Sequence, residues 1–258
     1  MSLTGKTLAN TYKDLLQVDN SNNGVDTVLR NIKDGEGTSS SLYISDDSVR
    51  VFPTNDDTTS ALSVKANSGA DVFRVDTTNQ IVKASGNNVN TQYANFSVVT
   101  THFSSASANQ HYAVPYANGN NAQTGTYIDL GSGTDPATSY TTSTDAYKLV
   151  PVMWYVPDAI SIDAVYSTEG ADAATGDTTR MHLFSYDFTS GSTSALTNGT
   201  LLAHNNDVTN AGYEQVYLST WTVDSAAVAS GKVILATFRS DSVNSDYSLN
   251  ITVKYHLT

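Results

Sequence analysis

The chain has 258 residues, and its 13 Lys and Arg against 25 Asp and Glu give a net charge of −12. Binding to phosphates or to an anionic lipid surface requires a basic face, so we expect no nucleic-acid partner and no membrane attachment or insertion. The sequence contains no cysteine, which excludes disulfides and thiolate chemistry. Ser, Thr, Asn, Asp and Tyr are abundant while charged residues make up only 15%, a mixture that favours strands and turns over helices.

The first predicted element is a short amphipathic helix near the N-terminus. Leu8, Tyr12, Leu15 and Leu16 fall at helical spacing within TLANTYKDLLQ. One or two turns of helix are unstable in water unless they pack on something, so we expect these side chains to form a docking or capping element. A frayed terminus without a role explains the same letters equally well.

Small β-units follow, at irregular spacings of about thirty residues. LQVDNSNNGV, LYISDDSVRV and FRVDTTNQIV each read apolar, polar, apolar, then a polar turn, then apolar again. Val18, Ile44 and Val75 occupy the same place in the three units. The units therefore read as short strands with period-two patterning and polar turns between them.

A fourth, partial unit, ALSVKANSGADVFRV, predicts a hairpin. It places Leu62 and Val64 opposite Phe73 and Val75 across an Asn-Ser-Gly turn. Each unit has only two or three inward side chains per strand, and burial worth about 25 cal/mol per Å² cannot offset about 1–2 kcal/mol of lost backbone entropy per residue. The segment must therefore share a core with copies of itself, dock onto a partner, or remain disordered.

We favour a shared core, because a disordered segment would not need period-two patterning. The residues expected in this core are Val18, Ile44, Leu62, Val64, Phe73 and Val75.

The organisation of the chain changes near residue 84. Residues 1–85 form the first predicted region, the polar GNNVNTQYAN segment (86–95) is the predicted linker, and strand signals are dense over residues 96–258. The clearest strand runs from Tyr247 to Leu257, where apolar and polar residues alternate. The other expected strands are 96–103, 112–116, 126–130, 147–156, 159–167, 180–188, 200–204, 213–223 and 232–239. The fold class predicted is all-β, with an antiparallel β-sandwich of jelly-roll type at the C-terminus.

Residues 61–86, ALSVKANSGADVFRVDTTNQIVKASG, resemble the shaft repeats of tailed-bacteriophage fibres. The matching phrase is L-x-V-x-x-x-x-G-x-x-x-F-x-V-D, which here is Leu62, Val64, Gly69, Phe73, Val75 and Asp76. The opening GKTLANTYKDLLQVDNSNNGVDTVLRNIKDGEG looks like the start of short virion proteins of marine podoviruses. The C-terminal region resembles, in pattern, the trimeric β-sandwich heads of phage fibres and decoration proteins.

This resemblance implies a homotrimeric structural protein at the virion surface, made in the host cytoplasm and attached to capsid or tail proteins. Residues 1–85 would then anchor and trimerise the chain through intertwined β-hairpins, and residues 96–258 would project as a head. The expected role is capsid decoration, a head fibre or a short tail fibre. A host-glycan receptor-binding module is the alternative, and a polysaccharide depolymerase is a further one. The resemblance implies no catalytic residue.

One motif hints at chemistry without completing it. Asp19-x-Ser21-x-Asn23-Gly24 begins like a calcium loop, but the twelfth position, which needs a bidentate Glu, is Arg30. An Asn-Gly turn explains the same residues. We therefore predict no metal and no cofactor.

Catalytic signals are also weak. The histidines lack the spacing of a metal motif, and no G-x-S-x-G elbow occurs. Glycoside cleavage needs two carboxyl groups that face one another, which residues far apart in sequence could still supply. We expect no enzyme. The scattered histidines are His102, His111, His182, His204 and His256.

Two tryptophans could provide an aromatic platform for a glycan, because flat rings stack on the apolar faces of sugars. These are Trp154 and Trp221. Trp154 and Tyr155 are neighbours on one expected strand and therefore point to opposite faces, so at least one of them belongs in a core. Core or subunit interface is the favoured location for these rings.

Overall fold

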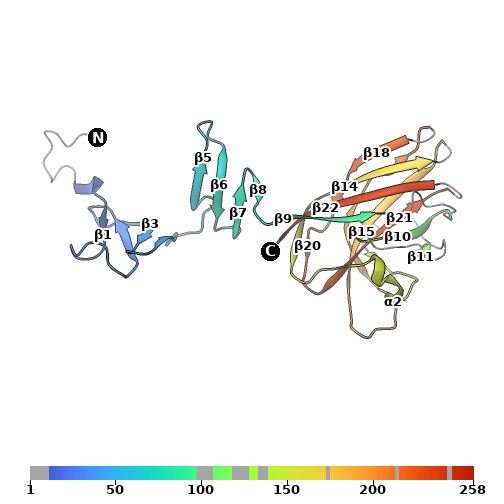
Figure 1. Cartoon of the computed structure of the whole chain (residues 1–258), viewed down its shortest axis with the longest axis horizontal. Coiled ribbons are helices and arrows are strands. Elements are labelled where there is room, and N and C mark those ends of the chain that lie inside the picture. Colours follow the sequence, from blue (N-terminus) through green and yellow to red (C-terminus); the bar gives the residue numbers. More distant parts are fainter. Residues whose placement is uncertain are drawn as a thin grey trace. The chain divides into compact units, whose positions relative to one another are not determined.

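The computed structural model describes residues 12–97, 107–117, 128–132, 139–172, 175–212, 215–242 and 246–258. The chain divides into two compact units, Met1–Val89 and Asn90–Thr258 (Figure 1). Strands dominate both, so the all-β prediction is confirmed; in the described residues the helical elements are α2 (Ala146–Leu149) and two 3-10 turns, η1 (Tyr12–Asp14) and η2 (Val150–Val152). None of the described helices is long and apolar enough to cross a membrane.

The N-terminal unit contains two four-stranded antiparallel sheets in which each strand pairs with the next along the chain. The first sheet consists of β1 (Gln17–Val18), β2 (Arg30–Lys33), β3 (Ser39–Ile44) and β4 (Val49–Val51). The second consists of β5 (Leu62–Lys65), β6 (Asp71–Asp76), β7 (Ile81–Ala84) and β8 (Asn87–Asn88). The predicted hairpin is present between β5 and β6, where Leu62 lies opposite Val75 and Val64 opposite Phe73. Gly69 closes its turn at φ 87°, a backbone conformation that glycine adopts without strain.

The two units meet between Val89 and Asn90, inside the segment 86–95 that was predicted as a linker. Most of that segment is strand, because β8 pairs with β7 and β9 (Thr91–Ser97) pairs with β22 (Asp246–Leu257). The sequence of β9 reads as polar since it buries only Ala94 and Phe96 and turns its other side chains outward.

The C-terminal unit is an antiparallel sandwich of two sheets, as predicted. The larger sheet has the order β11 (Asp129–Ser132), β10 (Gln110–Val114), β21 (Lys232–Ser240), β15 (Thr178–Asp187), β16 (Gly199–His204) and β12 (Ser139–Tyr140), with β13 (Trp154–Tyr155), β17 (Val208–Thr209) and β19 (Thr222–Val223) paired alongside. The smaller sheet has the order β18 (Gln215–Thr220), β14 (Ile160–Asp172), β22 and β9, with β20 (Ala227–Val228) paired to β14. Strands far apart in sequence thus become neighbours, such as β10 beside β21 and β9 beside β22.

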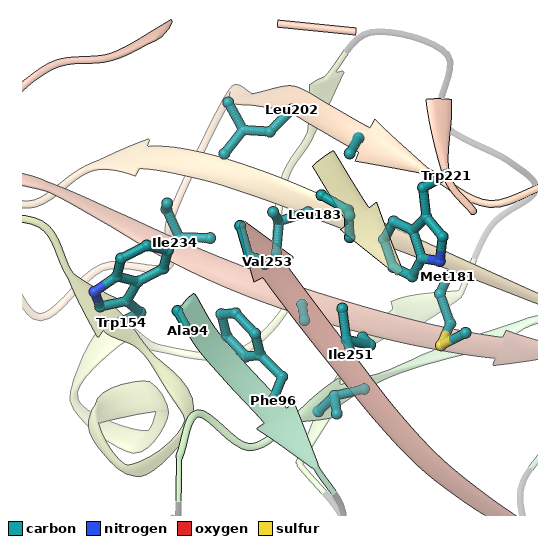
Figure 2. Packing of buried hydrophobic residues seen from close by; sticks show 14 of the residues in the cluster. Ala94, Phe96, Trp154, Met181, Leu183, Leu202, Trp221, Ile234, Ile251 and Val253 are labelled. Atoms are coloured by element: carbon teal, nitrogen blue, oxygen red, sulfur yellow. The ribbon is translucent and has the colours of Figure 1, made fainter. Parts of the chain in front are cut away.

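The main core lies between these two sheets (Figure 2). Alternate residues of β21 and β22 contribute to it, among them Ile234, Ala236, Ile251 and Val253. The intervening residues of β21 belong to a second core on the other face of the larger sheet, which α2 and η2 help to cover. Because both of its faces are buried, β21 reads as a nearly continuous apolar run rather than as an alternation.

The predicted strand over residues 147–156 is wrong in its first two thirds. The chain forms α2 and η2 there, and only Trp154–Tyr155 pair as β13. Ala146, Leu149 and Val152 are buried at a spacing of three, whereas Tyr147 is exposed, so the segment covers the second core with one helical face. Pro151 fits this arrangement because a helical first turn does not need its missing N–H.

Substitution of Gly199 tests the packing of the second core. A Cβ atom at Gly199 would lie 2.3 Å from Cε1 and Cζ of Tyr186, whose ring is fully buried and cannot move aside. We expect Gly199→Ala to lower the free energy of unfolding by about 1–3 kcal/mol through overpacking. Gly170→Ala is the matched control, since its Cβ would lie an ordinary 3.5 Å from Ser248 Cβ. Denaturant unfolding of both variants measures the difference, and equal stability would contradict the packing described here.

Candidate functional site

Strands β5, β6 and β7 of the second N-terminal sheet share an apolar face, which ends at β8, where Asn87 lies opposite Ala84. Residues that are directly opposite in an antiparallel pair share a face, and here they form two rows across β5, β6 and β7. We call these side chains the β5–β7 apolar face: Leu62, Val64, Phe73, Val75, Val82 and Ala84. The opposite face of the same strands carries Ser63, Arg74 and Lys83.

The first sheet shows a partial segregation, because Arg30 lies opposite Ile44 in one of its apolar rows. Its apolar residues pair with one another across strands: Val18 with Ile32, Leu42 with Val51, and Ile44 with Val49. Asn31, Tyr43 and Arg50 pair with each other in an adjacent row and point to the other side. The segregation is therefore clearest on the β5–β7 apolar face, whereas Tyr43 on the other side of the first sheet contacts Phe52, with ring centroids 6.3 Å apart.

No apolar side chain is buried among the described residues of the N-terminal unit. Leu62 and Val64 are 43% and 53% exposed, and Val49 is 72% exposed. The buried side chains of this unit, Asn31 and Asp76, are polar. A small sheet needs a covered hydrophobic face to be stable, so these faces are the candidate functional site, a surface for association.

The expected N-terminal docking element lies only in part within the described residues. Leu8 lies outside the described residues, and Tyr12 begins η1, a single 3-10 turn. Leu15 and Leu16 follow it and are exposed. The two leucines are therefore open to a partner, but they do not lie on an amphipathic α-helix.

The residues from Asp19 to Gly24, which begin like a calcium loop, form other contacts. The Asp19 carboxylate lies 2.7 Å from Lys33 Nζ, and Asn20 Nδ2 donates a hydrogen bond to the carbonyl of Gly24. Across the described residues, no group of three or more His, Asp or Glu is placed to hold a metal ion. The loop is held by an ion pair and a side-chain turn contact.

Both tryptophans lie in the main core of the sandwich (Figure 2). Trp154 is 6% exposed and stacks on Tyr116 with ring centroids 5.6 Å apart, and Trp221 is 5% exposed and donates from Nε1 to Ser167 Oγ over 2.8 Å. The core location favoured by strand alternation is therefore correct, and the suggested glycan platform at these two indoles is wrong because their faces are already covered. Tyr155, the neighbour of Trp154, points outward as the alternation requires.

The buried carboxylate of Glu169 forms hydrogen bonds that link the two sheets. It lies on β14 and accepts hydrogen bonds from Thr179 on β15 (3.1 Å), from Asn205 after β16 (3.2 Å) and from Ser167 (2.8 Å). Burial raises the pKa of this carboxyl, and the hydrogen bonds oppose that rise. These hydrogen bonds could not be predicted from the sequence, in which the inward position of Glu169 on an alternating strand was the one visible signal.

Glu169 also lines a cavity with Asp177, so two carboxyl-bearing residues border one space. The volume of this cavity is about 10 Å³, which is room for one water molecule. A sugar ring cannot enter it, so the pair does not support glycoside cleavage.

Three histidines that are scattered in sequence meet on the larger sheet. The rings of His111 and His182 are 5.7 Å apart and those of His182 and His204 are 6.5 Å apart, from strands β10, β15 and β16. His204 Nδ1 lies 2.7 Å from Asp224. Burial, reinforced by the charge of His111, lowers the pKa of His182 to about 2. No spacing rule could reveal this meeting, because the three residues belong to different strands.

The buried His182 predicts that the sandwich loses stability in acid. The folded imidazole stays neutral, whereas the unfolded one takes up a proton below its ordinary pKa of 6.5, so the free energy of unfolding falls as the pH drops below that value. One such proton lowers stability by about 1.4 kcal/mol per pH unit, and by about 3 kcal/mol at about pH 4.5.

Chemical denaturation of the wild type and of His182→Leu between about pH 6.5 and 4.5 checks this. We expect the variant to show a pH slope that is smaller by about one proton. An unchanged slope would mean that this imidazole is not the source of the acid sensitivity.

Comparison with known proteins identifies no family. No family model matches the chain, and no curated protein matches it. One solved structure that matches holds the CBM22-1 and GH10 modules of Clostridium thermocellum endo-1,4-β-D-xylanase 10B complexed with xylohexaose, at 18% identity and a TM-score of 0.23. The match covers 63% of this chain and 29% of that one. A TM-score this low carries no argument about the function of this chain.

Proposed function

We propose that the chain is a homotrimeric structural protein of a virion, in which the N-terminal unit assembles three copies and the C-terminal sandwich is displayed. The observation that carries this proposal is the open apolar side of each N-terminal sheet. Among the described residues of the N-terminal unit no apolar side chain is buried, and Leu62 and Val64 of the β5–β7 apolar face are 43% and 53% exposed. Association removes such a face from water, which is the dominant favourable term in assembly.

Identical copies are the simplest cover for this face. Each of the three strands places two apolar side chains on this face, so a second and a third copy present further apolar surface to it. Closed symmetry buries the same apolar face in every copy and leaves no such face exposed for the addition of further copies. Three is the stoichiometry of the fibre shafts that residues 61–86 resemble.

The polar side of the same sheet suits the outside of such an assembly. Asp71 pairs with Lys65 and with Arg74 Nη1, the latter at 3.3 Å, and the pairing with Lys65 lowers the pKa of Asp71. Charged pairs of this kind stay solvated and would be costly in a trimer core. The sheet is thus built to turn one side inward and the other to water.

Attachment and display divide between the two units in this proposal. Leu15 and Leu16, both exposed, would contact capsid or tail proteins. The C-terminal unit, with five basic and fourteen acidic residues, would face the medium as an acidic head that resists non-specific adhesion. The role is mechanical, as decoration or as a short fibre, and involves no catalysis.

A charge placed in the β5–β7 apolar face tests the proposal. We expect the wild type to be a trimer at micromolar concentration and Val64→Asp to dissociate, because a carboxylate in a shared core loses its hydration without a partner. Ser63→Asp is the matched control, since it adds the same charge to the same strand on the opposite side. Light scattering coupled to size-exclusion chromatography gives the masses. A monomeric wild type, or equal disruption by both variants, would refute the proposal.

A further inference from the structure

The loop that connects β15 to β16 forms one wall of a cleft of about 470 Å³ in the C-terminal unit. The residues that matter for its chemistry are Asp187, Phe188, Thr189, Ser192, Ser194 and Asn198. We propose that this cleft binds a neutral saccharide. The site lies wholly in the sandwich and uses none of the N-terminal apolar surface, so it stands apart from the trimer proposal.

The lining chemistry matches a sugar. Hydroxyl, amide and carboxylate groups offer several donors and acceptors within one concave surface, which is what the hydroxyls of a saccharide require. Phe188 is 40% exposed at this cleft, so its ring is open to the apolar face of a pyranose. Leu196 and Ala146, both buried, form an apolar base.

The cleft is preformed by backbone contacts of its own loop. Within the loop, Ser192 N donates to the Thr189 carbonyl over 3.1 Å, and Ser194 N donates to Ser192 Oγ over 3.2 Å. The far side of the loop is tied to the segment before α2, because Asn198 N donates to Thr141 Oγ1 over 3.1 Å. A site whose walls are already held loses less entropy when a ligand binds.

Charge selects a neutral ligand over an acidic one. Among the described residues that line the cleft, none is Lys or Arg, and Asp187 is acidic. Lys232 Nζ lies 2.6 Å from Asp187 Oδ1 and is committed to that ion pair. Uronic and sialic acids, or phosphorylated sugars, would need a free cationic group and would meet an acidic unit instead.

The test uses the full-length protein on a printed array of neutral, uronic-acid and sialic-acid oligosaccharides, followed by calorimetric titration with neutral gluco-, galacto- and manno-oligosaccharides. We expect signal from neutral members, a loss of affinity of about tenfold in Phe188→Ala, and retention in Phe188→Tyr, which keeps the ring. Tyr93→Ala is the matched control, because Tyr93 is an exposed aromatic residue on β9 in the other sheet.

The outcomes in solution decide the inference separately from the trimer, whereas the array signal of Val64→Asp rests on the proposed trimer. Thermal melting first confirms that each variant is folded. The saccharide site would be overturned if the folded wild type bound no neutral saccharide or bound only acidic ones. It would also be overturned if the wild type and Phe188→Ala bound neutral saccharides with equal affinity. Val64→Asp should keep the solution affinity of the wild type while losing signal on the array, since three linked clefts gain avidity on a surface. Lower solution affinity in Val64→Asp would place the site in the subunit interface and overturn the assignment to the sandwich alone.

Discussion

The unequal distribution of hydrophobic burial between the two units is the constraint on which this protein depends. In the C-terminal unit the strands β15 and β21 are covered on both sides, by the opposite sheet and by α2, η2 and their neighbours. Among the described residues of the N-terminal unit, apolar side chains are at most partly covered and none is buried. A sheet with an open apolar face has lost backbone entropy without gaining the burial that compensates for it. In the proposed trimer, association with further copies would restore that compensation, so assembly would be a condition of folding for this unit.

The C-terminal unit solves a different problem, which is to hold two large sheets in one register. Hydrophobic contacts between them are non-directional, so buried polar groups add the specificity. Glu169 reaches across the sandwich to Thr179 and Asn205, and the indole of Trp221 is oriented by Ser167, which also donates to Glu169. Every one of these groups has a partner, which is the condition under which a buried polar network does not destabilise a core.

The proposed assembly and the proposed recognition would be carried by separate parts of the chain. The β5–β7 apolar face consists of Leu, Val, Phe and Ala side chains, which suits a partner of the same composition. The cleft beside the β15–β16 loop is concave and rich in hydroxyls, which suits a small polar ligand with an apolar face. Because the loop that forms the cleft is fixed by its own hydrogen bonds, ligand binding there need not depend on how many copies associate.

The sequence by itself determined the features that depend on neighbouring residues. Period-two alternation from Tyr247 to Leu257 established a half-buried strand, and the Asn-Ser-Gly turn established the register of Leu62 against Val75. These patterns are local, because successive side chains of a strand point to opposite sides wherever the strand lies. The sparse apolar residues of the N-terminal region likewise predicted that one chain could not complete its core.

Only the tertiary structure decided which side of each element is covered. It placed Trp154 and Trp221 inside the sandwich, turned the expected strand around Tyr147 into a helical cover, and brought His111, His182 and His204 together from three strands. The cleft at Phe188 also arises only in the tertiary structure, because the sequence of its loop resembles any other polar turn. These outcomes depend on contacts between residues far apart in the chain, and no local pattern carries information about which distant strand becomes a neighbour.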